Sequence, residues 1–76
     1  MKTFKLFTTQ SCPKCPEIKD FVKSLDIEVK FVDAGTPEGL DEARKYNVTG
    51  VPTFIIFDDE KEVGRANSVE NIKRFI

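Results

Sequence analysis

At 76 residues, the chain has room for one small domain and no more. A domain of this size buries only about 60% of the surface that its unfolded chain exposes, so its stability depends on good packing. The length therefore excludes an enzyme with one domain for a dinucleotide and another for a substrate. We expect residues 1–76 to form a single domain.

Apolar patterning predicts four strands. Residues 51–57 are an almost unbroken apolar run, as expected of a central strand, and Pro52 marks an irregular start because proline cannot donate a ladder hydrogen bond. Residues 2–8 carry apolar side chains on both faces, whereas apolar and charged residues alternate over residues 27–31. A charged turn separates the central strand from a short edge strand at residues 62–66.

Three helices are expected between and after these strands. The first has apolar residues at helical spacing from Ile18 to Leu25. The second follows the N-cap residue Thr36, with Pro37 at the first helical position, and the third follows the N-cap residue Ser68. The residues expected to face inward from the second and third helices are Leu40, Ala43, Tyr46, Val69, Ile72, Phe75 and Ile76.

The order of elements is therefore β-α-β-α-β-β-α, which places the chain in the α/β class. The first β-α-β unit is expected to be a right-handed parallel crossover, and the last two strands an antiparallel hairpin. The expected sheet has four strands and is mixed.

Histidine is absent from the chain, and this absence removes more kinds of chemistry than any other feature of the composition. It excludes a Ser-His-Asp or Cys-His nucleophile and histidine-based zinc catalysis. The two cysteines cannot complete a four-cysteine zinc site within one chain. The formal net charge of -1 gives no electrostatic reason to expect nucleic acid or an anionic membrane as partner. We therefore expect chemistry that passes through sulfur, with no metal site.

The N-terminal residues lack the run of about 7–15 apolar residues that is typical of a signal peptide. We therefore expect the protein in the cytoplasm, where thiols are kept reduced. In that compartment, two cysteines close together in the sequence indicate catalysis or metal binding rather than a structural disulfide.

The motif Cys12-Pro13-Lys14-Cys15 lies between the first strand and the first helix. Proline is favourable in the first turn of a helix, so Pro13 predicts that Cys12 is the N-cap residue. There the helix dipole and the nearby Lys14 stabilise a thiolate and lower the pKa of the Cys12 thiol. We expect Cys12 to be the exposed nucleophile and Cys15, one turn further on, to be the more buried resolving thiol.

The spacing of the two cysteines suits disulfide exchange. Residues three apart on a helical turn lie about 5–6 Å apart, which is within the span of a disulfide. Two other uses of the pair stay open, namely a small metal-binding carrier and a glutathione-assisted iron–sulfur carrier. Pro16 allows two interpretations: the regular helix begins at this residue, or a loosened first turn shifts the redox poise.

Two segments of the chain together resemble the thioredoxin superfamily. Ser11-Cys12-Pro13-Lys14-Cys15 looks like its active-site turn, and Val51-Pro52-Thr53-Phe54 looks like its cis-proline segment. The resemblance covers essentially the whole chain, in a short, glutaredoxin-sized form. It implies the thioredoxin fold, a four-stranded mixed sheet flanked by three helices. It also implies that Pro52 faces the cysteines and that the backbone of Val51 binds an extended substrate.

Three departures from the family pattern narrow the prediction. Leu6 occupies the position at which thioredoxins carry a buried Asp that helps the resolving thiol lose its proton, so Cys15 must rely on Lys30 or on solvent. Pro13-Lys14 replaces the usual Gly-Pro between the cysteines. Arg65-Ala66-Asn67-Ser68 stands where glutaredoxins carry a glutathione-binding Gly-Gly-x-Asp segment, which argues against a glutathione site.

The resemblance implies a protein thiol–disulfide oxidoreductase that reduces disulfides of partner proteins and carries electrons in cell redox homeostasis. Its only redox group is the Cys12–Cys15 pair, with no further cofactor, and an upstream disulfide reductase regenerates it. We expect a monomer.

Overall fold

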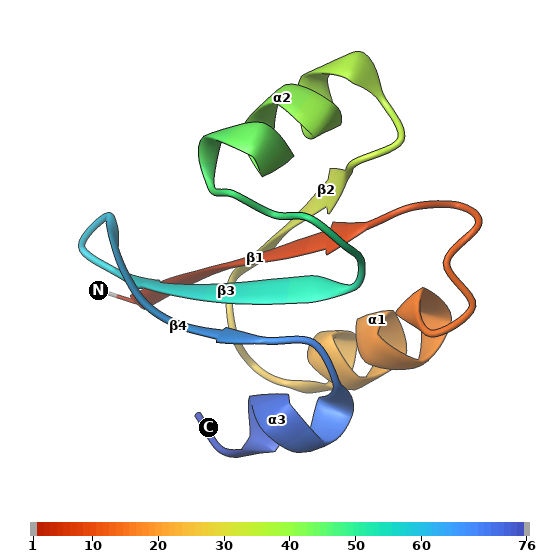
Figure 1. Ribbon diagram of the computed structural model, residues 1–76. Coiled ribbons are helices and arrows are strands. Elements are labelled where there is room, and N and C mark those ends of the chain that lie inside the picture. Colours follow the sequence, from red (N-terminus) through yellow and green to blue (C-terminus); the bar gives the residue numbers. More distant parts are fainter. Residues whose placement is uncertain (1, 76) are drawn as a thin grey trace.

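The computed structural model describes residues 2–75 of the chain. The described residues form the predicted sequence of strands and helices (Figure 1). These elements are β1 (Lys2–Thr8), α1 (Cys15–Ser24), β2 (Val29–Asp33), α2 (Pro37–Lys45), β3 (Thr53–Asp58), β4 (Lys61–Ala66) and α3 (Val69–Lys73). None of these helices is long and apolar enough to cross a membrane. Ile76, expected on the inner face of the last helix, lies outside the described residues.

The four strands form one mixed sheet in the order β2-β1-β3-β4. β1 runs parallel to β2, and β3 and β4 form an antiparallel hairpin, which confirms both predicted pairings. β1 also pairs antiparallel with β3, with Leu6 opposite Phe54. β3, the predicted central strand, is therefore an inner strand of the sheet, and β1 lies beside it.

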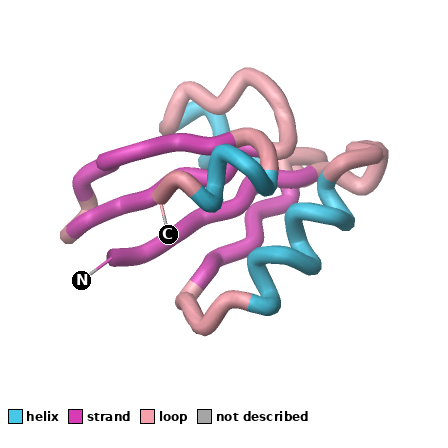
Figure 2. Tube along the Cα trace, turned by 90° about the horizontal axis from the view of Figure 1, so that it is seen from below, coloured by secondary structure: helices cyan, strands magenta, loops and turns pink. Residues whose placement is uncertain are grey.

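Helices cover both faces of the sheet: α1 and α3 lie on one side and α2 on the other (Figures 1 and 2). Neighbouring residues of β1 supply the two faces, because side chains alternate along a strand. Leu6 packs in a core with Ile18 and Ile72, from α1 and α3. Phe7 packs in a second core with Ala43 of α2. Both side chains are fully buried, as expected of a strand covered on two faces.

The N-cap of α2 is Thr36, as predicted, and its hydroxyl oxygen accepts a hydrogen bond from the Gly39 amide at 3.1 Å. Gly39 lies so close to β2 that a Cβ there would stand 1.7 Å from the Asp33 carbonyl oxygen. The inward orientation predicted for Leu40 is wrong, because this side chain is 42% exposed. Gly39 and Ala43, one turn apart, are the buried residues of the helix and turn Leu40 toward solvent.

The N-cap of α3 is Ser68, as predicted, and its hydroxyl oxygen accepts a hydrogen bond from the Asn71 amide at 3.2 Å. Ile72 is buried as expected. Phe75 is 46% exposed and not in the core, because α3 ends at Lys73 and the helical period does not extend to it. Its ring lies against the backbone of Gly64 on β4.

Candidate functional site

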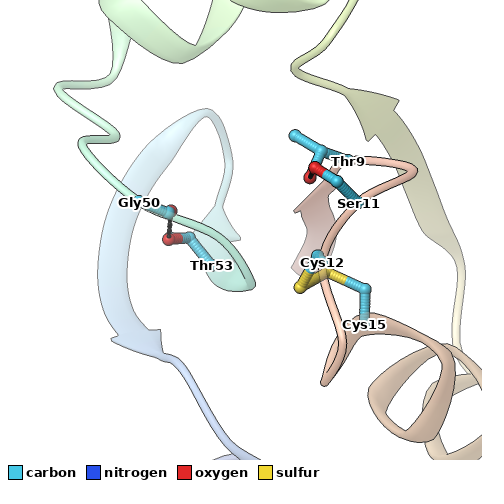
Figure 3. Close-up of a disulfide and its surroundings, with 6 residues drawn as sticks. All are labelled: Thr9, Ser11, Cys12, Cys15, Gly50 and Thr53. Atoms are coloured by element: carbon cyan, nitrogen blue, oxygen red, sulfur yellow. Dashed lines mark hydrogen bonds between the residues drawn. A yellow bond between two sulfur atoms is a disulfide. The ribbon is translucent and has the colours of Figure 1, made fainter.

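Cys12 and Cys15 form a disulfide at the N-terminal end of α1 (Figure 3). Their Cα atoms lie 5.4 Å apart, within the predicted range. Cys12 is 8% exposed and Cys15 is 2% exposed. The predicted order of exposure is confirmed, although in the disulfide form Cys12 is much less exposed than the motif suggested.

The predicted start of the first helix is wrong. The N-cap is Lys14 rather than Cys12, and α1 begins at Cys15. Pro16, the second residue of the helix, has no N–H that could bond to the carbonyl of Cys12. Helical hydrogen bonding therefore starts with the Ile18 amide, which donates to the Lys14 carbonyl at 3.3 Å.

This later start favours the first interpretation of Pro16, a regular helix that begins beside it. The first N–H groups of any helix have no partner inside the helix, so a proline in the first turn removes no helical bond. Because Cys12 is bonded to the first residue of α1, its sulfur still lies at the positive end of the helix dipole. The position thus remains suited to stabilising a thiolate.

The predicted substrate-binding segment lies across from the cysteine turn (Figure 3). The Val51–Pro52 peptide bond is cis, as the family resemblance implies. The Thr53 hydroxyl donates a hydrogen bond to the Gly50 carbonyl at 2.6 Å, which closes the loop around this bond. A groove of about 340 Å³ between the two segments is lined by Lys14, Thr49, Gly50, Val51, Pro52, Thr53 and Asn67.

The structure thus brings Lys14 of the cysteine turn to the same groove as Val51 and Pro52. Pro52 is buried and Val51 is half-buried. Pro13 is exposed on the turn between the cysteines. Asn67, which follows β4 and belongs to the segment that departs from glutaredoxins, also lines this groove.

A second pocket, of about 300 Å³, opens beside the disulfide on the α1 side and is lined by both cysteines. Its charged lining residues are Lys19, Asp20 and Lys23. Sequence reasoning missed these residues, although Cys15, Lys19 and Lys23 are spaced to share one face of a helix. The pocket gives solvent a route to Cys15 despite the low exposure of that residue.

Lys30, which the sequence suggested as an aid to deprotonation of Cys15, lies on the wrong face of the sheet. Its Nζ atom is 3.6 Å from a carboxylate oxygen of Glu42 on α2. α1 covers the face of the sheet opposite to α2 (Figure 1). Lys30, paired with Glu42 of α2, therefore lies on the other face from Cys15. Leu6 is fully buried in the core beneath α1, so no ionisable group replaces the family's buried Asp at that position.

An ion pair on β4 holds the start of the loop that carries Val51 and Pro52. Arg65 Nε lies 2.5 Å from a carboxylate oxygen of Glu62. The Arg65 guanidinium also donates to the backbone carbonyls of Tyr46 and Asn47, immediately after α2. No local sequence pattern indicates this contact, because it joins residues 18 and 19 positions apart.

Within residues 2–75, no group of three or more histidine, cysteine, aspartate or glutamate side chains is arranged to hold a metal ion.

Comparison with known proteins identifies the family. A family model described as "Thioredoxin domain" matches residues 2–76. A probable thioredoxin from Archaeoglobus fulgidus is 37% identical over 62 residues, covering 76% of this chain and 68% of the relative. A thioredoxin from Methanocaldococcus jannaschii is 30% identical over 79 residues, covering 92% of this chain and 91% of the relative.

Solved structures agree with this assignment. The thioredoxin of Fasciola hepatica superposes with a TM-score of 0.81 at 32% identity, covering 97% of this chain and 74% of that one. Oxidised thioredoxin O2 of Arabidopsis thaliana superposes with a TM-score of 0.84 over 99% of this chain and 70% of that one, and at 21% identity it supports the fold alone. These relationships do not favour a metal-binding or iron–sulfur carrier.

Proposed function

Because the chain belongs to the thioredoxin family and is a thiol–disulfide oxidoreductase, we propose that it reduces disulfides of partner proteins through Cys12 and Cys15. The observation that carries this proposal is the Cys12–Cys15 disulfide at the N-terminus of α1, with Cys12 as the more exposed partner. The disulfide form corresponds to the end of one reductive cycle.

In the first step, the Cys12 thiolate attacks one sulfur of the substrate disulfide. A Cys12–substrate bond forms, the substrate S–S bond breaks, and the other substrate sulfur leaves as a thiolate that takes up a proton. The N-terminus of α1 and the ammonium group of Lys14 stabilise the attacking thiolate, and Pro13 restricts the backbone of the turn between the cysteines. The backbone of Val51, beside Pro52, holds the substrate in an extended conformation.

In the second step, the Cys15 thiolate attacks the Cys12 sulfur. The Cys12–Cys15 bond forms, and the second substrate sulfur leaves and is protonated. The substrate has then gained two electrons and two protons, and the cysteine pair has lost them. Water in the pocket beside Cys15 takes the proton from that thiol, in place of the buried Asp that Leu6 replaces.

We further propose a cellular role for this cycle. The protein acts as a single-domain monomer in the cytoplasm and carries electrons in redox homeostasis, with no cofactor besides its disulfide. An upstream disulfide reductase, rather than glutathione, returns the Cys12–Cys15 pair to the dithiol. Arg65, which stands where glutaredoxins carry their glutathione-binding segment, is bonded instead to Glu62 and to the backbone carbonyls of Tyr46 and Asn47, which supports this choice of donor.

Cysteine variants test the assignment of roles. Cys15→Ser should accumulate a mixed disulfide with substrate proteins, visible on non-reducing gels and reversed by dithiothreitol. Cys12→Ser should form no such adduct and should not reduce insulin disulfides. Full insulin reduction by Cys12→Ser would overturn the proposal, and an adduct formed only by Cys12→Ser would reverse the two roles.

A further inference from the structure

The groove between the cysteine turn and the Val51–Pro52 loop has an unbalanced charge. Lys14 is the only ionisable residue among the described residues that line it. The other lining residues are apolar or neutral and polar. A peptide segment that crosses this groove therefore meets one positive charge and no negative charge among its lining residues.

The charge of Lys14 is available to a partner. Its side chain is exposed, and across residues 2–75 it makes no ion pair. A neighbouring pocket of about 220 Å³, which Lys14 and Asn67 also line, contains Glu17 and Glu70. These carboxylates disfavour an acidic group on their side, so an acidic group attracted by Lys14 is confined to the groove.

Asn67 adds a hydrogen-bond donor to the same groove. Its side-chain oxygen accepts a hydrogen bond from Asn71 Nδ2 at 2.9 Å. The NH₂ group of Asn67 is left without a partner among the described residues. An ammonium group and a free amide donor, in a groove whose own lining contains no carboxylate, are complementary to a carboxylate.

We propose that the groove selects partner proteins with an Asp or Glu side chain one or two residues from the cysteine that Cys12 attacks. The carboxylate is held between the Lys14 ammonium and the Asn67 amide while the exchange takes place. This inference rests on the proposed function and adds no chemical step to it. It specifies the substrate class as acidic segments around an accessible disulfide.

The test uses short cysteine peptides with blocked ends that differ only in Glu, Gln or Lys beside the cysteine. Each peptide is activated as a mixed disulfide with 2-thiopyridine, which is uncharged. When the Cys12 thiolate of the reduced Cys15→Ser variant bonds to the peptide sulfur, pyridine-2-thione leaves and its absorbance gives the rate constant. One exposed charge pair corresponds to about a 1.5- to fivefold faster reaction for Glu than for Gln, with Lys slower than both. The differences should shrink in about 1 M salt.

Charge reversal gives the decisive comparison. Introducing Lys14→Glu into the Cys15→Ser variant should invert the order of the reaction rates of the three peptides. Any effect of this change on the intrinsic reactivity of Cys12 cancels in the ratio of the rates. Adding Lys61→Glu makes the same change in net charge at the end of the hairpin far from Cys12 and should keep the order. Asn67→Ala should reduce the preference for Glu without inverting it.

Equal rates for the three peptides, or the same order in the Lys14→Glu variant, would overturn the inference and leave the proposed function standing. If the charge of residue 14 affects the rate with oxidised glutathione but not the rate with the Glu peptide, the inference would also be overturned. The groove would then recognise a small thiol compound. A Cys15→Ser variant that reacts with no peptide would instead overturn the proposed role of Cys12, and this inference with it.

Discussion

The guanidinium group of Arg65 donates a hydrogen bond to the backbone carbonyl of Tyr46, at the C-cap of α2. The last carbonyl groups of a helix have no partner inside the helix, and Arg65 supplies one from the edge strand of the sheet. Asn47, the next residue, has a φ of 59° and its carbonyl accepts a second bond from Arg65 at 3.4 Å. Arg65 thereby fixes the start of the loop that ends at Val51 and Pro52.

Replacing Arg65 by Ala removes these bonds and should lower the free energy of unfolding by about 1 kcal/mol, the usual worth of a few partly exposed hydrogen bonds. Urea denaturation of the oxidised protein measures the change. Arg44→Ala is the matched control, since Arg44 is an exposed arginine near the same end of α2, and it should change stability by much less. Equal losses in both variants would show that net charge, not the contact with Tyr46, is responsible.

Stability in acid should depend on Glu62. Hydrogen bonds from Arg65 hold the pKa of Glu62 below its ordinary value of 4.5. The carboxylate therefore binds a proton less readily in the folded state than in the unfolded state. Its contribution to stability is present above about pH 4.5 and is lost as the pH falls through the lower, folded pKa.

The Glu62→Gln variant checks this pH dependence. At pH 7 it should be less stable than the parent by a few tenths of a kcal/mol, the usual worth of an exposed pair. At about pH 3 the difference should shrink, because the parent loses the same interaction by protonation. Urea titrations of both proteins between pH 3 and 7 measure this, and a difference that stays constant with pH would contradict the assignment.

Two glycine substitutions should have opposite outcomes. In Gly39→Ala, the new Cβ would stand 1.7 Å from the Asp33 carbonyl oxygen, so α2 must shift from β2 at a cost of about 1–3 kcal/mol. Alanine favours the helix over glycine by about 1 kcal/mol, which stabilises the variant. This gain does not outweigh the clash of the new Cβ with the backbone. In Gly50→Ala, no atom lies within 4 Å of the new Cβ, so stability should be unchanged or slightly higher. Thermal unfolding of the two variants decides this, and a Gly39→Ala protein as stable as its parent would contradict the packing of α2.

Pro16→Ala should leave the reduction potential of the Cys12–Cys15 pair unchanged. α1 begins at Cys15, so the nitrogen of residue 16 has no helical partner whether or not it carries a hydrogen. Lys14→Ala is the positive control: it removes a charge that stabilises the Cys12 thiolate, so it should make the potential more negative. Equilibration with a thioredoxin of known potential measures both variants. A change in reduction potential in Pro16→Ala as large as that in Lys14→Ala would support the alternative interpretation, in which Pro16 loosens the first turn of the helix.

Local signals in the sequence were enough for the order of the elements and the two caps at Thr36 and Ser68. They were also enough for the pairing of Cys12 with Cys15, because each of these features depends on residues within a few positions of one another. The start of α1 was predicted too early because Pro13 and Pro16 both fit a first helical turn, and only the hydrogen bond from Ile18 to Lys14 distinguishes them.

Tertiary structure alone decided the features that join distant segments. The antiparallel pairing of β1 with β3, the position of Lys30 on the face away from α1, and the contact of Arg65 with Tyr46 all arise from packing between separate elements. The exposure of Leu40 has the same origin, because the close approach of Gly39 to β2 sets the rotation of α2. The cysteine motif and its chemistry are thus determined locally by sequence. The groove that brings Lys14 and Asn67 to Val51 and Pro52 exists only because the sheet brings three loops together.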